Sequence, residues 1–393
     1  MTSYKLEEIF EFIRNGASIK QFDTKEGYPI TRIETIANGY IDTERMGYAN
    51  IMLLEKYNNY LLKKGDILMS HINSEKHLGK VAIYEGLNKD IIHGMNLLCL
   101  RPKQALLYPK YAFYYFNAMD FKKQLPKITK KSVNQASFAV NDLKKFNINI
   151  PSIDNQIKVV DVLNKGKDLI DKRKKQIEEL DVLVKSRFIE MFGNPVSNLK
   201  GWKKTNIGSK FEIKTGATPS RKENTYWENG NIPWVKTTEL KEVVINETEE
   251  YITNEGYNKS SVNLLPKDTV LIAMYGQGKT RGMTAKLGIK ATTNQACASI
   301  LPNPEENMDF IWYQLKLSYE DLRNLGRGGS QPNLNTNLIK SYELIFPPME
   351  LQDRFVKFIE QVDKLKFEME NSLKELEDNF NSLMQKAFKG ELF

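Results

Sequence analysis

Residues 355–387 read FVKFIEQVDKLKFEMENSLKELEDNFNSLMQKA, and their apolar positions recur every seven residues. The first series is Phe355, Val362, Met369, Leu376 and Leu383. A companion series is Ile359, Leu373, Phe380 and Ala387, broken only by Lys366. Apolar residues at this spacing over about five heptads are typical of a coiled coil. The stretch therefore predicts a helix of about 40 residues, roughly 60 Å long.

The same pattern occurs once more, 196 residues earlier in the chain. Pro151 and Pro347 mark the two helix starts, and Gly193-Asn194-Pro195 ends the first helix. Two stripes of equal length and shared register favour pairing with each other as an antiparallel coiled coil. The alternative is that each helix packs separately on its own globular domain. The residues of the first helix that match the stripe are Leu163, Ile170, Ile177, Val184 and Met191, with Val159 and Leu180 beside them.

The segments that precede the helices are also related to each other. Residues 13–18 (IRNGAS) match residues 213–218 (IKTGAT), and residues 61–68 match residues 264–271 with nearly the same offset. The order of matching motifs is kept, which indicates a tandem duplication. We predict globular domains at 1–150 and 194–347, each followed by a helix, at 151–193 and 348–393. The fold class is α+β: two mixed α/β globular domains separated by a long antiparallel two-helix coiled coil, with a pseudo-two-fold internal repeat.

Short apolar runs alternate with Gly- and Asn-rich loops in the globular domains. Strands are predicted at Asp66–Ser70, Lys80–Tyr84 and Thr269–Met274, and helices at Tyr108–Phe121 and Phe310–Leu322. No regular alternation of strand and helix is visible, so the pattern does not indicate a Rossmann sheet.

The composition excludes several classes of protein. The chain has 2 cysteines and 3 histidines, too few for a disulfide scaffold or a Cys-rich zinc site. Its start has no secretory signal pattern, and its apolar runs are too short to span a bilayer. We therefore expect a cytoplasmic protein with no membrane association. The net charge is +8, and the basic surplus lies mainly in residues 1–150 and 196–347, which suits a polyanionic partner.

Cationic residues precede small polar or amide side chains in both globular domains. Lys130, Lys131, Asn134 and Gln135 form the first such group, and Arg327, Ser330 and Gln331 form the second. Arginine and lysine neutralise phosphates, and Asn and Gln can pair with adenine. A solvated loop tip explains any single residue equally well, but the recurrence in both copies favours DNA binding.

Residues 273–280 (AMYGQGKT) resemble a loosened Walker A motif. A working P-loop needs a helix directly after its Lys-Thr pair, and Gly282 and Gly288 argue against one. A polar loop carrying Lys279 and Arg281 suits phosphate and base-edge contacts on DNA better. A nucleotide-dependent ATPase therefore remains the weaker alternative, and a coiled-coil scaffold without sequence preference is a third. Methyltransferase and nuclease motifs are not recognisable, so we expect no catalysis by this chain.

The whole chain resembles the DNA-specificity subunit of type I restriction–modification systems. The second domain is similar to one type of target-recognition domain through residues 214–220, 226–227, 232–237, 275–282, 293–296 and 331–333. The first domain resembles another type through residues 65–68, 70–74, 79–80 and 94–96. The heptad helices match the two spacer helices of that family.

The resemblance implies a non-catalytic subunit in which each domain reads one half of a split, asymmetric DNA target and the helix pair sets the gap. Two methyltransferase subunits and two ATP-dependent translocase–nuclease subunits would be the partners. S-adenosylmethionine, ATP and Mg²⁺ would belong to those partners, with no metal or cofactor in this chain. The DNA-contacting candidates from the motifs are Ser70, His71, Asn73, Lys80, Lys214, Thr218, Lys236, Thr237, Tyr275, Gln277, Lys279, Thr280, Arg281, Asn294 and Gln295.

Overall fold

The computed structural model describes residues 1–393 except 52, 88, 134, 277 and 327–332. Its contacts divide the chain into two compact units. Unit 1 comprises Met1–Lys174 and Asn371–Phe393, and unit 2 comprises Lys175–Glu370. The division cuts through both long helices, whereas the sequence-based boundaries follow changes of secondary structure. Each unit thus holds one globular part and about half of each long helix.

The two long helices have the predicted length and position. Helix α5 spans Ile153–Phe192 (40 residues), and α11 spans Met349–Lys389 (41 residues). Each begins two residues after the predicted proline, and each carries a carboxylate in its first turn, where the helix dipole favours negative charge. The predicted heptad helices are therefore confirmed.

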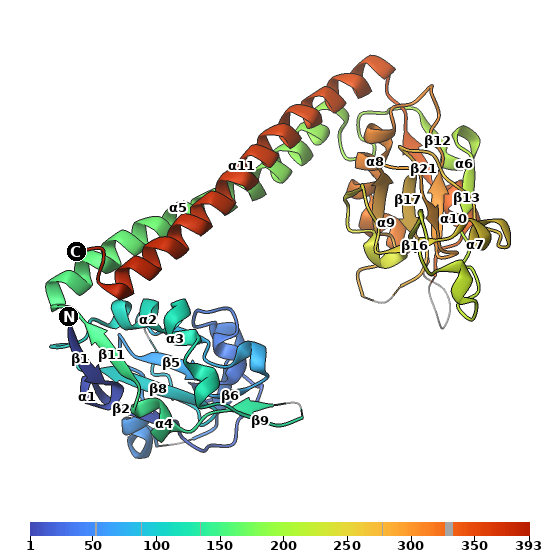
Figure 1. The fold of residues 1–393 in the computed structure, drawn as a ribbon. Coiled ribbons are helices and arrows are strands. Elements are labelled where there is room, and N and C mark those ends of the chain that lie inside the picture. Colours follow the sequence, from blue (N-terminus) through green and yellow to red (C-terminus); the bar gives the residue numbers. More distant parts are fainter. Residues whose placement is uncertain (52, 88, 134, 277, 327–332) are drawn as a thin grey trace. The chain divides into compact units, whose positions relative to one another are not determined.

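Within each unit the two helix halves run antiparallel (Figure 1). In unit 1, Lys174 forms an ion pair of 2.7 Å with Glu377, while Leu163, earlier in α5, packs in one cluster with Met384, later in α11. In unit 2, Asp181 pairs with Lys366 at 2.6 Å, and the rings of Phe188 and Phe355 lie 5.3 Å apart. Residues later in α5 therefore contact residues earlier in α11. The predicted antiparallel pairing is correct.

The ends of the paired helices also belong to the cores of the globular parts. In unit 1, Leu163, Met384 and Ala387 are buried in the same cluster as Tyr111 and Phe116. In unit 2, Phe188 and Phe355 are buried with Phe310. The alternative of separately packed helices is therefore wrong, although the ends of the paired helices do pack on the globular parts.

The globular part of unit 1 is built on an antiparallel sheet in the order β2-β8-β5-β7. Helix α2 packs on it (Figure 1). Tyr111 and Phe116 of this helix are buried in the same cluster as Phe10, and the rings of Phe116 and Phe10 are stacked. The strands are β1 Thr2–Lys5, β2 Phe10–Asn15, β3 Tyr28–Ile30, β4 Gly47–Ala49, β5 Ile67–Ser70, β6 Ile72–Asn73, β7 Val81–Ile83, β8 Leu97–Pro102, β9 Lys130–Lys131, β10 Ala136–Ser137 and β11 Asn147–Ile150; the α-helices are α1 Leu6–Ile9, α2 Pro109–Asn117, α3 Met119–Lys122 and α4 Val140–Lys144.

The globular part of unit 2 has a main sheet in the order β13-β20-β17-β18-β15 and a smaller one in the order β16-β14-β19. Helix α8 packs on the main sheet, with Phe310 and Ile311 fully buried. The strands are β12 Lys204–Asn206, β13 Ile213–Thr215, β14 Ile232–Val235, β15 Val244–Ile245, β16 Glu250–Ile252, β17 Val270–Ala273, β18 Thr284–Leu287, β19 Thr292–Thr293, β20 Cys297–Ile300 and β21 Glu343–Ile345; the α-helices are α6 Ile207–Lys210, α7 Asn254–Asn258, α8 Met308–Leu317, α9 Tyr319–Asn324 and α10 Thr336–Ser341.

The three predicted strands are present as β5, β7 and β17, but both predicted short helices are interrupted. The first breaks at Ala118, whose backbone is extended (φ −69°, ψ 149°), and the second at Ser318. After each break a short helix follows and buries one large side chain, Phe121 or Leu322. The same break in both units supports the internal duplication.

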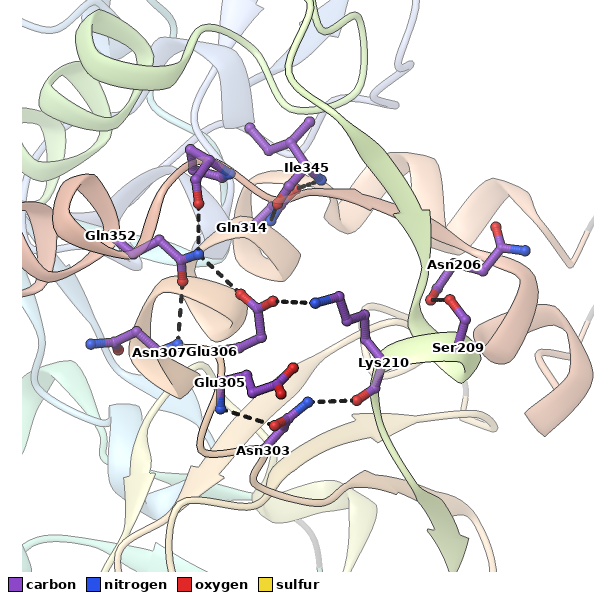
Figure 2. Close-up of polar contacts among 11 residues, drawn as sticks. Asn206, Ser209, Lys210, Asn303, Glu305, Glu306, Asn307, Gln314, Ile345 and Gln352 are labelled. Carbon is purple, nitrogen blue, oxygen red and sulfur yellow. Dashed lines mark hydrogen bonds and ion pairs between the residues drawn. The ribbon is translucent and has the colours of Figure 1, made fainter.

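A buried glutamine fastens each helix start to its globular part. In unit 2 the Gln352 amide donates to Pro347 O (2.9 Å) and Glu306 Oε2 (3.0 Å) and accepts from Asn307 N–H (3.2 Å), as Figure 2 shows. In unit 1, Gln156 makes the equivalent bonds to backbone groups of residues 106, 108 and 151. A buried polar group that loses its hydrogen bonds costs free energy, so a rotation of the helix start that breaks these bonds is unfavourable. The two glutamines therefore fix the direction in which each helix leaves its globular part.

Candidate nucleic-acid interface

Three strand ends of unit 2 gather several predicted contact residues at one edge. Strand β14 pairs in parallel with β19, so Lys236-Thr237 and Asn294-Gln295 leave the smaller sheet together. The Asn294 N–H donates to Val235 O at 3.1 Å, which locks these two ends side by side. The hydroxyl of Thr218, which follows β13, donates to Gln295 Oε1. The side chain of Gln295 is therefore held by a neighbour.

Gly216 explains how the 213–218 segment reaches this edge. A Cβ at Gly216 would lie 1.9 Å from Thr293 O, so only glycine allows the Ala217 N–H to donate to that oxygen at 3.0 Å. Unit 1 repeats the arrangement, because a Cβ at Gly16 would lie 2.2 Å from His93 O. The glycine of the repeated motif is thus required by a close approach of two backbones.

Tyr275 joins the same edge from β17. The Met274 N–H donates to Ala296 O at 2.8 Å, so Tyr275 leaves its strand beside the Asn294–Ala296 turn. Its side chain is 39% exposed. The polar loop that carries Lys279, Thr280 and Arg281 begins here, and Lys279 is exposed while Thr280 and Arg281 are half-buried.

Helix α9 holds the backbone of this loop. The Tyr319 hydroxyl donates to Lys279 O at 2.7 Å, and the Arg323 guanidinium donates to Gly278 O and Arg281 O. Arg323 also donates to the Tyr319 hydroxyl at 2.8 Å. Neither Tyr319 nor Arg323 is among the contact residues that the sequence motifs indicate. No local signal identifies them as loop supports, because they lie about 40 residues from the loop.

The loop does not have P-loop geometry. Strand β18, beginning at Thr284, follows the Lys279-Thr280 pair where a P-loop needs a helix N-terminus. The Gly282 N–H donates to Ala273 O at 2.9 Å, which closes the segment as a connection between two antiparallel strands. The geometry favours a polar loop over a nucleotide site.

Lys236 and Lys214 have carboxylate partners. Lys236 Nζ lies 2.8 Å from Glu250 and 2.9 Å from Glu249, and hydrogen bonds to these carboxylates raise the pKa of Lys236 to about 12. Lys214 lies 3.3 Å from Glu212. Lys236 is therefore better placed to brace this edge than to neutralise a phosphate. Thr237 begins a short 3₁₀ turn, Thr237–Glu239, beside it.

Arg221 is a further cation at this edge that the sequence reasoning did not select. Its guanidinium lies 3.6 Å from the Trp227 ring centroid and 4.9 Å from that of Trp234, and it pairs with Glu250 at 2.5 Å. Half of its side chain remains exposed. The signal that could have found it is an arginine close before the Tyr-Trp pair.

In unit 1 a small antiparallel sheet in the order β6-β10-β9 brings separate motifs together. Asn73 and Lys131 both lie opposite Ala136, and Lys130 lies opposite Ser137. Gln135 directly precedes β10 and is exposed. The predicted contacts Asn73, Lys130, Lys131 and Gln135 therefore lie on or directly beside one small sheet, with Asn73 and Lys131 on one face and Lys130 on the other.

Two of the predicted contacts in unit 1 are buried. Ser70 and His71 are only 2% and 5% exposed, and the His71 ring lies 6.2 Å from Phe138. Burial lowers the pKa of His71 to about 4, so the ring is neutral at physiological pH. The prediction that these side chains contact DNA does not fit their burial. Ser70 supports Asn73 instead, because its Oγ accepts a hydrogen bond of 3.3 Å from the Asn73 side-chain amide.

Lys80 is half-buried and donates to Ala37 O at 2.8 Å, and Lys131 pairs with Glu75 at 2.6 Å. Lys130 is exposed. The remaining candidates, Asn134, Gln277, Arg327, Ser330 and Gln331, lie outside the described residues.

Two absences apply to the described part of the chain. Within residues 1–393 without the ten omitted positions, no group of three or more His, Cys, Asp or Glu could hold a metal ion. The helices of that part include none that is both long and apolar enough to cross a membrane.

The buried His93 predicts that the stability of unit 1 depends on pH between about 4 and 6.5. Burial lowers its pKa to about 4 from 6.5, so the unfolded chain binds a proton that the folded chain does not. Stability is therefore lost as pH falls from 6.5 towards 4, by about 2 kcal/mol at pH 5 from this group. All three histidines lie in unit 1 and all four tryptophans in unit 2. We expect hydrogen exchange at pH 5 to speed up in unit 1 before tryptophan fluorescence reports opening of unit 2.

The matched variants for this measurement are His93→Leu and the half-buried His77→Gln. The first should remove about half of the pH dependence that the buried histidines give unit 1, because His71 keeps its own lowered pKa, and the second should leave it unchanged. A pH dependence of unit 1 that His93→Leu leaves at its full size would contradict the assignment.

A family model described as the type I restriction modification DNA specificity domain matches residues 1–181 and again residues 199–378. A chain described as the type I restriction enzyme MjaX specificity subunit of Methanocaldococcus jannaschii is 31% identical over 92% of this chain and 86% of that one. Two solved structures share the fold. One, from work on complex assembly and conformational transition of the type I R-M system, has a TM-score of 0.66, 16% identity, and coverage of 100% of this chain and 98% of that chain. The other, the S subunit of a type I restriction–modification system from M. genitalium, has a TM-score of 0.53, 17% identity, and coverage of 98% and 96%.

Proposed function

Because this chain belongs to the type I restriction–modification DNA specificity family, we propose that its two units each read one half of a bipartite, asymmetric DNA target. DNA recognition is the role of the family, and the division of labour between the units is our inference. The observation that carries it is the gathering of Thr218, Tyr275, Asn294 and Gln295 at one edge of unit 2, next to a loop that presents Lys279. The corresponding loop of unit 1 has a different sequence, so the two half-sites should differ.

Thr218 and Gln295 form the proposed base-reading pair. The Thr218 hydroxyl donates to Gln295 Oε1, which fixes the plane of the amide and leaves its NH₂ group free to donate elsewhere. A glutamine amide can pair with adenine through one donor and one acceptor in the major groove. We therefore assign adenine to the base that Gln295 contacts. The backbone carbonyl of Lys279 accepts a hydrogen bond from Tyr319, and its side chain is exposed. Lys279 would therefore contact a phosphate.

The assembly is also a proposal. We infer a non-catalytic subunit that joins two DNA methyltransferase subunits and two ATP-dependent restriction subunits, and that acts on DNA in the cytoplasm. S-adenosylmethionine, ATP and Mg²⁺ would be held by those partners. The support for this arrangement is family membership and the presence of the two long helices.

The test is binding of two single variants of the complex across a set of single-base target variants. Gln295→Ala should cost about 1–3 kcal/mol and relax specificity at one base pair. Lys279→Ala should weaken binding to all sequences alike and make the salt dependence less steep by about one unit. The control is Lys267→Ala, an exposed lysine of unit 2 that precedes β17, whereas the loop follows that strand.

Unchanged affinity and specificity in both variants would remove this edge from the interface. Equal affinity of the wild-type complex for target and scrambled duplexes would instead favour the scaffold without sequence preference. ATP binding by the chain alone, lost in Lys279→Ala, would favour the ATPase alternative.

A further inference from the structure

A pocket of about 360 Å³ in unit 1 is lined by four lysines and one glutamate. It lies between the connection from β5 to β7 and the segment from α3 to β9. The first contributes Lys76 and Lys80, and the second contributes Lys122 and Lys131. The glutamate is Glu75. Lysines from two segments distant in sequence thus converge on one concave surface.

The positive charges in this pocket are only partly compensated. Lys131 pairs with Glu75 at 2.6 Å, and Lys80 donates to Ala37 O at 2.8 Å, which satisfies a donor but does not neutralise the charge. Among the described residues, no carboxylate forms an ion pair with Lys76 or Lys122. The surrounding protein removes part of the water from Lys122 and thereby lowers its pKa, and the charge of Lys80 lowers it further. The lining therefore favours an anion between these lysines.

At the position of unit 2 that matches Lys122, an arginine is hydrogen-bonded to the backbone of its own loop. Gly79 N–H donates to Ser70 O at 2.8 Å, and Gly282 N–H donates to Ala273 O at 2.9 Å, so the two strand connections correspond. Phe121 and Leu322 are both fully buried, and the next residues are Lys122 and Arg323. Arg323 donates to the carbonyls of its own loop, whereas Lys122 lines an open pocket. The cation at this position therefore supports a loop in unit 2, where it is Arg323, and lines a cavity in unit 1, where it is Lys122.

We propose that the pocket of Lys76, Lys80, Lys122 and Lys131 binds a phosphate group. This proposal rests on the proposed function, because we take the phosphate group to be a backbone phosphate of the DNA that unit 1 reads. The small sheet that carries Asn73 adjoins the pocket, since Lys131 lies on the same face as Asn73 and also belongs to the pocket lining. A phosphate held here would fix the register of the DNA on unit 1 without reading a base.

The test uses the complex with its methyltransferase partners and a target duplex between about 50 and 200 mM salt. Lys76→Gln, Lys122→Gln and the double variant are compared with Lys145→Gln, an exposed lysine of unit 1 outside the pocket. The double variant should make the slope of log affinity against log salt less steep by about 0.9, the value for one phosphate, and not by twice that value. Specificity at every base pair should be retained. Lys145→Gln should behave as wild type.

A second measurement distinguishes the source of the phosphate. The chain without DNA is heated with inorganic phosphate or with chloride at equal ionic strength. A phosphate-dependent rise in Tm that the double variant loses, together with an unchanged salt slope on DNA, would keep the phosphate site but assign it to a free phosphate compound. No change in either measurement would overturn the proposal. Failure of the wild-type complex to prefer its target would defeat the proposed function, whereas the Tm measurement would still report on the pocket.

Discussion

Inserting one heptad after Lys174 in α5 and one after Glu370 in α11 is expected to lengthen the gap between the half-sites by about three base pairs. Seven helical residues add about 10 Å, and successive base pairs are spaced by about 3.4 Å. These positions are chosen from the antiparallel register. Lys174–Glu377 lies on one side of the insertion and Asp181–Lys366 on the other, so both pairs can re-form.

The control is the same heptad inserted into one helix only. Beyond the insertion, the apolar stripe of the lengthened helix would be displaced by seven residues relative to the stripe of the other helix. The buried cluster around Leu163 and Met384 and the one around Phe188 and Phe355 could then not form at the same time. We expect this variant to lose target methylation altogether. The measurement is the methylated motif at base resolution in cells that contain the matching methyltransferase. Methylation by the two-helix variant at sites with the original gap would show that the helices do not set it.

Exchanging unit 1 for that of another specificity subunit should change one half-site and leave the other and the gap unchanged. The structure determines which residues must be exchanged together. Tyr111 lies 5.2 Å from Phe388 of α11, ring centroid to ring centroid, and the Tyr108 N–H donates to Gln156 of α5 at 2.8 Å. A chimera should therefore carry residues 1–174 and 371–393 from one parent.

The matched control exchanges residues 1–150 alone. It leaves Gln156, Leu163 and Met384 facing a foreign core, and we expect lower stability because large buried side chains lose their fitted neighbours. Thermal unfolding compares the two chimeras, and base-resolution methylation gives their motifs. A folded, active chimera of the complete unit 1 in which both half-sites changed would contradict independent reading.

The predictions for the long helices were correct because their determinants are local and periodic. A seven-residue apolar repeat specifies both the helix and the stripe that it buries, and a proline two residues before the helix marks its start. The duplication was visible because the same residues recur in the same order, and Gly16 and Gly216 recur because each is required by a close backbone contact within its own unit. The interrupted short helices were not predicted, because the burial of Phe121 and Leu322 after each break depends on the rest of the core.

The sequence alone determined the helices, their repeat and the composition of the polar loops, since these depend on spacing along the chain. Only the tertiary structure decided which cations are available to a ligand. Lys236 and Lys279 are both lysines of predicted contact motifs, yet one is held by two carboxylates and the other is exposed. His71 is buried against Phe138 although its motif appears polar. The physical reason is that a charge or a ring is paired, buried or exposed by residues from distant segments, and that neighbourhood exists only in the folded chain.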